Sequence, residues 1–398
     1  MFLFVVVAFA LLPLLLVFFQ EASLIAPFAN FVAVRWVSFV VVPVALTGTL
    51  LFSLNETAGE WLLEFAGLLL DIIWPLLQWL SGLEFSQWVQ HEPLAWTLLP
   101  ALFGVFVLFM PRGLPARWVG VLLLLPLFLV KPATPGQGEA LVTVLDVGQG
   151  LATVVQTRHH VLVYDAGPRF SDSFDTGQAV VVPYLRHQGI RRLDALVVSH
   201  GDNDHIGGVS SLLAAYPATR ILSSVPDEIP AAHAGFCRRG QQWHWDGVRF
   251  EILNPAEGDS LTGNNASCVL RIESAAGQSV LLTGDIERRA EQQLLQTMAA
   301  RLAVDVLVVP HHGSNTSSGP AFVAAVNPVL ALMPSGYRNR YGFPKAEVLD
   351  RYVDIHASVG QTGLGGALAV MLAKDTDVPE IHRYRDSQPR YWHSGNNR

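Results

Sequence analysis

The chain has 398 residues, with 26 basic and 33 acidic side chains, a formal net charge of −7 at pH 7 and 51% hydrophobic residues. Residues 1–130 hold only three of the basic and seven of the acidic side chains, so an apolar part precedes a polar part. This length accommodates two or three domains. Neither part is net basic, which excludes nucleic-acid binding through overall charge, so such binding would depend on local patches or metal ions.

The first 130 residues are expected to form an N-terminal segment of transmembrane α-helices. A helix needs about 20 predominantly apolar residues to cross the hydrocarbon core of a bilayer. The run at 33–54 is the clearest span, whereas Glu64 and Asp71 in the next run also suit an amphipathic helix. The apolar runs lie at residues 1–19, 33–54, 61–83, 95–110 and 118–130.

The basic residues of the short loops predict the orientation of this segment. Arg112 and Arg117 lie in the loop at residues 111–117, and this local excess of positive charge places the loop in the cytoplasm. If the run at 118–130 then crosses the bilayer, everything after Lys131 lies on the outer side of the inner membrane. The domain that follows is therefore expected to be extracytoplasmic.

The composition also predicts the remaining boundaries. Met1 leads directly into an apolar run without a basic n-region, which argues against a signal peptide and suggests the downstream part of a longer protein. Residues 131–140 contain Pro and Gly and form the expected linker. A folded domain at 141–375 follows. The tail at 376–398 is basic and aromatic and suits either a local nucleic-acid contact or a solvated, partly frayed end.

The domain at 141–375 alternates short β-type runs with helical patterns, which predicts an α/β fold whose chemistry lies at strand ends. The expected strands lie at 141–148, 153–157, 160–167, 195–200, 220–224, 248–253, 268–273, 279–285 and 305–313. The expected helices lie at 176–188, 207–216, 285–302, 319–326 and 345–353. Polar residues end several strands, namely Asp146, Asp165, His200, Asp285 and the pair His311 and His312.

The stretch VSHGDNDHIGG, residues 198–208, gathers four potential metal ligands. His200, Asp202, Asp204 and His205 occupy the turn after an apolar strand, and two glycines allow the next helix to pack closely. Imidazole nitrogens and carboxylate oxygens suit zinc, manganese or iron. A capping or turn role explains any one of these residues but not all four together. The sequence therefore predicts a metal site here.

Two further pairs of residues have simpler explanations. Asp146 and Asp165 each lie in a turn where the carboxylate can accept backbone N–H groups, so we expect both to orient neighbouring groups. Cys237 and Cys268 have no metal-type spacing. They could pair in an oxidising compartment or remain free thiols, and the sequence does not decide between these alternatives.

The motifs together resemble those of a known superfamily. SHGDNDHIGG, preceded by VYDAG and followed by LLTGD and VPHHGS, is similar to the metallo-β-lactamase superfamily, which implies an αββα sandwich and a dinuclear metal site. LDVGQG at 145–150, NNASCVL at 264–270 and NRYGFP at 339–344 narrow the resemblance to ComEC-type DNA-internalisation competence proteins. The segment FFQEASLIAPFANFVAVRWVSFVVVP is similar to the end of that family's membrane domain. The resemblance covers nearly the whole chain but only the distal part of the family's length.

The resemblance implies a set of metal ligands. They are His200, Asp202, Asp204, His205, Asp285 and His312, with His311 as the alternative to His312. Asp202 stands where most superfamily members have histidine, the third-motif histidine has no counterpart, and Phe343 stands where many family members have histidine. These departures leave an oxygen-rich site for two divalent ions, which favours Mn²⁺ or Mg²⁺ over Zn²⁺; Mn²⁺ is the expected ion, with Zn²⁺ and Mg²⁺ as alternatives. Asp204 or Asp202 is expected to orient the attacking water.

The resemblance implies a role in DNA uptake during natural transformation. The expected activity is that of an inner-membrane, metal-dependent nuclease that degrades the non-transported strand, with DNA, the membrane and other uptake components as partners. The alternatives are a hydrolase of a small ester, lactone or thioester, and a non-catalytic component of the DNA channel. The candidate substrate contacts are Asn264, Asn265, Ser267, Ser314, Asn315, Ser317, Asn339 and Arg340.

Overall fold

The computed structural model describes residues 2–83, 85–111, 113, 115–373 and 379–393. The expectation for Arg112 therefore lies outside the described residues, as do both ends of the expected tail at 376–398. The chain divides into two compact units. One comprises residues 1–132 with 186–189, and the other comprises residues 133–185 with 190–398.

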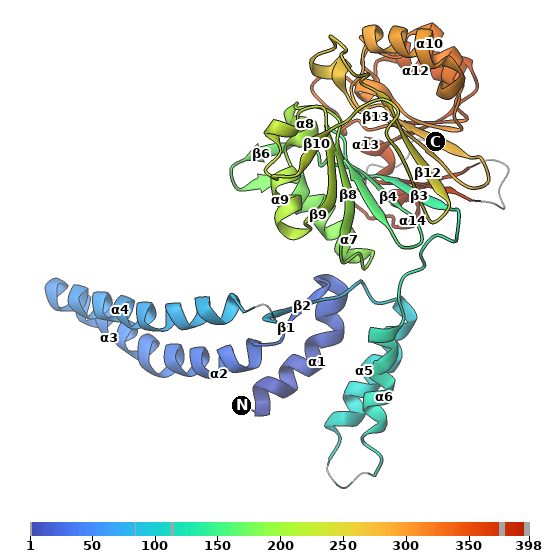
Figure 1. Cartoon of the computed structure of the whole chain (residues 1–398). Helices are drawn as coiled ribbons and strands as arrows, with labels where there is room; N and C mark the ends of the chain where they lie inside the picture. Colours follow the sequence, from blue (N-terminus) through green and yellow to red (C-terminus); the bar gives the residue numbers. More distant parts are fainter. Residues whose placement is uncertain (1, 84, 112, 114, 374–378, 394–398) are drawn as a thin grey trace. The chain divides into compact units, whose positions relative to one another are not determined.

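Helices occupy the apolar runs of the first unit (Figure 1). They are α1 (Phe2–Phe18), α2 (Ala26–Trp36), α3 (Val42–Phe52), α4 (Glu56–Ser81), α5 (Ala95–Phe109) and α6 (Val119–Leu129). A π-helical turn joins α2 to α3 and makes one helical run of 27 residues, Ala26–Phe52. Within the described residues, this run is the one helix that is long and apolar enough to cross a membrane. Two short strands, β1 (Glu21–Ser23) and β2 (Gln87–Val89), pair antiparallel beside these helices.

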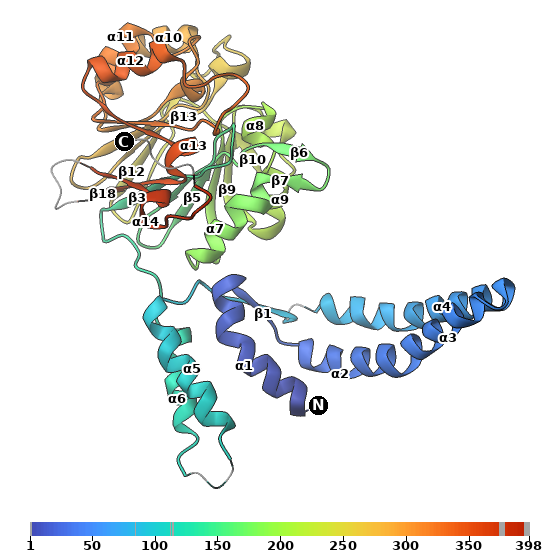
Figure 2. The same cartoon turned by 180° about the vertical axis from the view of Figure 1, so that it is seen from behind.

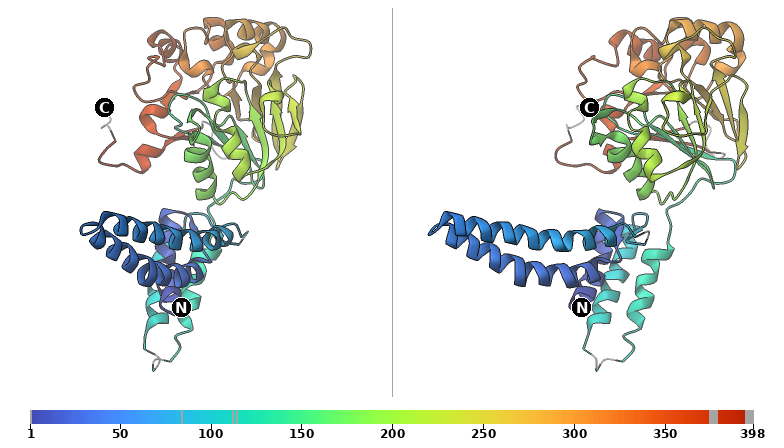
Figure 3. Two further views of the ribbon diagram at one scale, coloured as in Figure 1. Left: turned by 90° about the vertical axis from the view of Figure 1, so that its left-hand side faces the viewer. Right: turned by 60° about the vertical axis from the view of Figure 1, so that its left-hand side comes forward.

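Small residues allow the helices of this unit to approach closely. α5 and α6 lie side by side as a helical hairpin (Figure 3). A Cβ atom on Gly104 would lie 2.6 Å from the carbonyl oxygen of Gly120, so both positions exclude a larger residue. Small residues at such a contact allow two helix backbones to approach closely.

The second unit is built on two large β-sheets. The first has the strand order β10-β9-β8-β5-β4-β3-β18-β19, and the second has the order β11-β12-β13-β14-β15-β16-β17. The first comprises β3 (Ala140–Val144), β4 (Thr153–Gln156), β5 (Val161–Tyr164), β8 (Leu193–Val198), β9 (Ala218–Ser223), β10 (Ala234–Phe236), β18 (Leu368–Leu372) and β19 (Ile381–Arg383). The second comprises β11 (Gln242–Trp245), β12 (Val248–Asn254), β13 (Val269–Glu273), β14 (Ser279–Leu282), β15 (Val306–Val308), β16 (Leu330–Met333) and β17 (Ser358–Gln361).

Alternate side chains along each central strand enter two different cores. On β8, Ala195 and Val197 pack in the core between the sheets, whereas Leu196 and Val198 pack with residues of the covering helices. This period of two follows from the pleat of a strand that is buried on both faces. The helices α7 (Val182–His187) and α9 (Val209–Ala215) cover the first sheet, and α10 (Arg288–Leu302), α11 (Pro320–Val326) and α12 (Ala346–Asp354) cover the second (Figures 1 and 2). The predicted αββα sandwich is confirmed.

The structure contains strands that the sequence analysis did not assign. β16, β17 and β18 extend the sheets beyond the expected strands, and a two-stranded hairpin, β6 (Arg169–Ser171) with β7 (Phe174–Asp175), lies after β5. Runs as short as LALM in β16 cannot be distinguished from part of a buried helix by periodicity alone. Their pairing partners in the sheet decide their conformation.

Close backbone contacts hold the predicted metal motif against the first sheet. The short helix α8 (Asn203–Ile206) is followed by Gly207 and Gly208, whose N–H donates to the carbonyl of Gly167. A Cβ atom on Gly208 would lie 2.3 Å from the carbonyl oxygen of Ala166. The glycine is therefore required for the loop to reach its position.

We expect Gly208→Ala to lower the free energy of unfolding of the second unit by about 1–3 kcal/mol, because the added methyl group overpacks a backbone contact. Denaturant unfolding of the purified chain, followed by tryptophan fluorescence, measures this change. Gly235→Ala on β10 is the matched control, since its new Cβ would have no neighbour closer than 3.8 Å. Equal destabilisation by the two substitutions would contradict the role assigned to Gly208.

Candidate metal centre

Four potential ligands converge at one edge of the two sheets. Asp204 and His205 lie on α8, Asp285 follows β14, and His312 lies in the turn η5 (Pro310–Gly313) that follows β15. One ligand atom of each residue lies within 4.8 Å of the others. Parallel pairing of β14 with β15 brings the ends of these two strands to the same edge of the sheet.

The contacts inside this cluster join imidazole nitrogens to carboxylate oxygens. His205 Nε2 lies 3.1 Å from Asp285 Oδ1 and 3.3 Å from His312 Nε2. His312 Nε2 lies 3.2 Å from Asp204 Oδ2 and 3.4 Å from Asp285 Oδ2. Several lone-pair-bearing atoms are thus directed at one point, as in a metal site.

A further layer of buried groups contacts the two imidazoles. Asp165 is fully buried, and its Oδ2 lies 2.8 Å from His205 Nδ1 and accepts a hydrogen bond from Ser199 Oγ at 2.7 Å. The backbone N–H of Ser199 donates to Asp165 Oδ1 at 2.7 Å. His312 Nδ1 lies 2.9 Å from the carbonyl oxygen of Pro334. These contacts direct Nε2 of both histidines into the cluster, which is the usual arrangement behind a metal-binding histidine.

His200 and Asp202 adjoin the four-residue cluster. The His200 ring lies 4.2 Å from the His205 ring between centroids, and its Nε2 lies 3.5 Å from Asp202 Oδ2. Two buried atoms, His200 Nε2 and Asp285 Oδ1, lie near Asp202 and His205 but make no well-aligned hydrogen bond among the described residues. Unsatisfied buried polar atoms of this kind call for a ligand or ion. The donor set and these two atoms fit divalent metal ions.

The ionisation of the cluster reflects close charge pairing. Burial alone would raise the pKa of Asp285, but His205 and His312 hold it well below its usual range. Burial would lower the pKa of His312, but Asp285 and Asp204 raise it to about 9. The pKa of His205 is likewise raised well above its usual value, against the effect of burial, by Asp285 and Asp165. The imidazoles and carboxylates of the cluster therefore shift one another's pKa strongly.

Other predicted site residues lie near the cluster but outside it. His311 Nε2 is 3.8 Å from Asp285 Oδ2, and its Nδ1 lies 3.0 Å from Thr316 Oγ1. Asp146 accepts a hydrogen bond from the N–H of Gly148 and pairs with Arg385 at 2.8 Å. The orienting roles of Asp146 and Asp165 and the choice between His311 and His312 stay predictions.

The candidate substrate contacts differ widely in accessibility. Ser267 and Ser317 are fully buried, and their hydroxyl groups donate to backbone carbonyls, so their placement does not favour substrate contact. Asn265 accepts hydrogen bonds from the N–H groups of Glu287 and Ala290 at the start of α10.

The remaining candidates are more varied in their surroundings. Ser314 is buried and contacts Thr316, whereas Asn264 is partly buried. Asn315 and Arg340 are exposed to solvent, and Asn339 is partly buried. The roles of these residues in binding substrate stay predictions.

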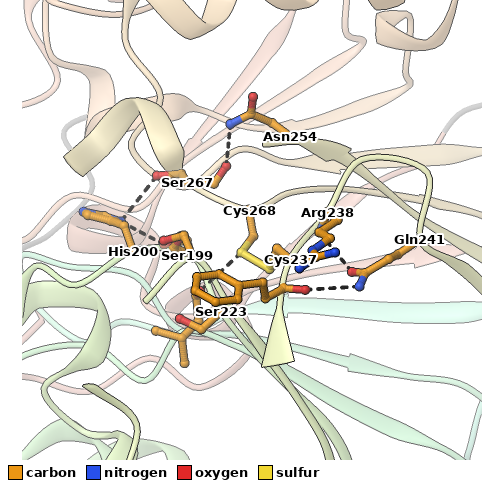
Figure 4. The surroundings of a disulfide bond; sticks show 12 residues. Ser199, His200, Ser223, Cys237, Arg238, Gln241, Asn254, Ser267 and Cys268 are labelled. Carbon is orange, nitrogen blue, oxygen red and sulfur yellow. Dashed lines mark hydrogen bonds between the residues drawn. A yellow bond between two sulfur atoms is a disulfide. The ribbon is translucent and has the colours of Figure 1, made fainter. Parts of the chain in front are cut away.

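A disulfide joins Cys237 to Cys268 close to Ser199 and His200 (Figure 4). The N–H of Cys268 donates to the carbonyl of Ser199, the residue that precedes His200. The preceding residue, Ser267, has its Oγ 3.4 Å from His200 Nδ1 (Figure 4). The sequence left the pairing of the two cysteines open, because they lie 31 residues apart and no spacing rule joins them.

Sequence reasoning also missed Ser199 and Arg385. Ser199 lies inside the quoted motif but carries no metal-ligand signal, and its contribution depends on the position of Asp165. Arg385 is separated from Asp146 by 239 residues, so only the folded chain brings them together.

Comparison with known proteins agrees with this geometry. Residues 145–336 match the family model described as Metallo-beta-lactamase superfamily, and residues 3–115 match the model described as Competence protein. The sandwich and its buried cluster are therefore those of a metallo-β-lactamase-superfamily domain. The chain thus carries a competence-protein region followed by a metallo-β-lactamase-superfamily domain, and the expected resemblance is confirmed.

The chain is similar to competence protein ComA of Neisseria gonorrhoeae, with 36% identity over 89% of this chain and 49% of that protein. It is also 32% identical to recombination protein 2 of Haemophilus influenzae, over 91% of this chain and 48% of that protein. The chain spans about half the length of these relatives. Igni18, a metallo hydrolase of Ignicoccus hospitalis, aligns with 57% of this chain and 98% of its own at 16% identity and a TM-score of 0.39.

We expect the affinity of the metal-free protein for Mn²⁺ to fall as the pH drops below about 9. A metal ion binds neutral imidazole, so it must displace the protons that the raised pKa values of His205 and His312 retain. The affinity should change about tenfold per pH unit for each proton displaced. Calorimetry in two buffers that differ in ionisation enthalpy measures both affinity and proton release. Mn²⁺ binding without proton release at neutral pH would contradict this expectation.

Proposed function

We propose that this protein is a membrane-anchored, metal-dependent nuclease of the DNA-uptake machinery, acting on the strand that is not transported. The observation that supports the proposal most strongly is the buried cluster of Asp204, His205, Asp285 and His312 in a chain that also carries a competence domain. The relatives named for competence and recombination agree with a role in handling DNA.

The proposed ligands would hold two divalent ions, with Mn²⁺ favoured. His205, Asp204, Asp285 and His312 surround one position, and the adjoining His200 and Asp202 extend the set. Three of these six residues are carboxylates, and hard oxygen ligands favour Mn²⁺ or Mg²⁺ over Zn²⁺. When bound, such ions supply activation of water and neutralisation of phosphate charge. His312 is preferred to His311 because it belongs to the cluster.

The protein's own residues orient the reacting groups. The side chain of Asp202 is 59% exposed, and its pKa is held below the usual value by the neighbouring His200 imidazole, so it stays ionised at neutral pH. An ionised, accessible carboxylate beside the cluster can hold a water molecule in position and accept a proton from it. Asp204, whose side chain is 33% exposed, has the same access. Asp165 acts through His205, whose ring it fixes.

The proposed location is the inner membrane, with the hydrolase domain on the extracytoplasmic side. The apolar helix at Ala26–Phe52 supports membrane anchoring. The disulfide between Cys237 and Cys268 supports an oxidising compartment, since disulfides persist outside the reducing cytosol. Strand degradation on that side would leave the partner strand free for transport.

We expect the purified full-length chain to hydrolyse fluorescently labelled DNA when Mn²⁺ is added and to lose this activity in a chelator. Asp204→Ala should lower the rate about 100-fold or more, because it removes a charge on which metal binding depends. Asp165→Asn should lower the rate about 10- to 100-fold, since the carboxylate that orients His205 is lost. Gel electrophoresis of the DNA products measures both rates.

Asp350→Ala is the matched control, because Asp350 is an exposed carboxylate on α12 away from the cluster. It should leave the rate unchanged. Bound Mn²⁺ without any cleavage of DNA would contradict the proposed nuclease. Faster hydrolysis of a small ester, lactone or thioester than of DNA would identify a different substrate class. Unimpaired DNA uptake by cells that carry Asp204→Ala would favour a non-catalytic channel component.

We expect replacement of both Cys237 and Cys268 by serine to lower the free energy of unfolding by about 2–4 kcal/mol, because the bond closes a loop of 31 residues. Thermal unfolding with and without a reducing agent measures the effect. Reduction should destabilise the wild-type chain and leave the double variant unchanged. An identical response of the two proteins to reductant would contradict the disulfide.

A further inference from the structure

A loop of unusual composition lies next to the candidate metal centre. Residues 337–345, YRNRYGFPK, contain three basic residues, two tyrosines and one phenylalanine, and no acidic residue. This local excess of positive charge contrasts with the net charge of −7 of the whole chain. The loop begins directly after residue 336, where the match to the superfamily model ends. We call it the aromatic–cationic loop.

The rings and cations of this loop are layered. The rings of Tyr341 and Phe343 stack with centroids 5.5 Å apart and an interplanar angle of 19°. The Arg340 guanidinium lies 4.8 Å from the centroid of Tyr341, and the Lys345 ammonium lies 5.4 Å from that of Phe343. Arg338 lies over the ring of Tyr337 in the same way, at 5.2 Å. Tyr341 is 45% exposed and Tyr337 is 46% exposed, so these rings are accessible.

Internal hydrogen bonds hold the loop in this conformation. Asn339 Nδ2 donates to the carbonyls of Gly336 and Phe343 at 2.9 and 2.6 Å, and Asn339 Oδ1 accepts from the N–H of Phe343 at 2.9 Å. Lys345 Nζ donates to the carbonyl of Tyr341 at 2.7 Å. A binding surface that is ordered beforehand loses less conformational entropy when it binds.

The loop is also joined to the metal-binding segment. The N–H of Lys345 donates to the carbonyl of Gly313 at 2.9 Å, one residue after His312. A Cβ atom on Gly313 would lie 2.6 Å from Pro344 Cβ, so the two backbones are in close contact. The ring of Phe343 lies 6.0 Å from that of His311. The loop and the segment that carries His312 are therefore joined by a backbone hydrogen bond and by close packing.

We propose that the aromatic–cationic loop is a nucleobase-stacking subsite for single-stranded DNA, which delivers the neighbouring phosphodiester to the candidate metal centre. In this subsite an unpaired base stacks on the layer formed by Tyr341 and Arg340, and the positive charges of Arg338, Arg340 and Lys345 contact adjacent phosphates. The proposal rests on the proposed function for the reaction that follows, but it concerns binding by residues outside the cluster.

The chemistry of the loop favours a single strand over a duplex. Aromatic rings and guanidinium planes stack on the faces of bases, and those faces are exposed only when bases are unpaired. Cations beside the rings follow the phosphate backbone. A small neutral ester would use neither feature. The combination thus indicates a strand that has already been separated from its complement.

The test measures binding without hydrolysis, in a chelator, with the full-length chain in detergent micelles. Fluorescence anisotropy of a labelled oligothymidylate should show about tenfold weaker binding by Tyr341→Ala, the loss expected for one stacked base. Tyr341→Trp should retain binding, because it keeps an aromatic ring at this position. Binding of a blunt duplex should change little. A 2-aminopurine in the oligonucleotide should be quenched on binding to the wild-type chain, and less so on binding to Tyr341→Ala.

Phe236→Ala is the matched control, since Phe236 is a similarly exposed ring, 49% accessible, at the edge strand β10. It should bind the oligonucleotide like the wild-type chain. Arg340→Gln is a second variant, which keeps the ring of Tyr341. It should reduce the slope of log K against log salt concentration by about the amount expected for one phosphate contact. Unchanged thermal unfolding and Mn²⁺ binding of both loop variants would show that the fold and the cluster are intact.

The outcomes separate this proposal from the proposed function. Oligonucleotide binding by Tyr341→Ala equal to that of the wild-type chain would overturn the subsite, even if the wild-type chain cleaves DNA. Weakened oligonucleotide binding together with absent cleavage would support the subsite and contradict the nuclease. If Tyr341→Ala lost binding to phosphatidylglycerol vesicles but bound the oligonucleotide like the wild-type chain, the loop would instead be assigned to lipid binding, and the subsite would be overturned.

Discussion

The structure of the second unit depends on holding two carboxylates and two imidazoles together in a nearly dry environment. Asp285, His205 and His312 are buried almost completely, and their ligand atoms lie within 4.8 Å of one another and of Asp204. Burial of so many polar groups is costly unless each charge is paired and each imidazole is fixed. Asp165, Ser199 and the carbonyl of Pro334 supply that second layer, which leaves the Nε2 atoms free to face the cluster.

The sandwich provides the rigidity that this arrangement requires. Strands with both faces buried end at the edge where the ligands emerge, so small movements of the ligands are opposed by two cores. The disulfide at Cys268 adds a covalent link directly behind His200. A site built on strand ends and short turns is therefore well suited to chemistry that requires fixed distances.

Charge is distributed unevenly for a protein proposed to handle DNA. The chain is acidic overall, so a polyanion would be repelled by much of its surface. The residues around the cluster offset this locally, through the metal ions that the ligands would hold and through the basic residues of the aromatic–cationic loop. Electrostatic attraction of DNA would then be confined to the candidate metal centre and the aromatic–cationic loop. Such a distribution favours engagement of one exposed strand over general adhesion to duplex DNA.

The sequence by itself determined the apolar helices, most of the strands of the sandwich and the local part of the metal motif. Those features arise from short-range patterns: continuous apolar runs, alternation along strands, and four ligands within six residues. The resemblance named Asp285 and His312 beside Asp204 and His205, but only the tertiary structure brings these four residues together, pairs Cys237 with Cys268 and places Asp165 against His205. Two adjacent histidines look alike in sequence, and only the folded chain places His312, rather than His311, within the four-residue cluster. The physical reason is that these contacts depend on which strands are neighbours in a sheet, and strand order is not encoded in any local pattern.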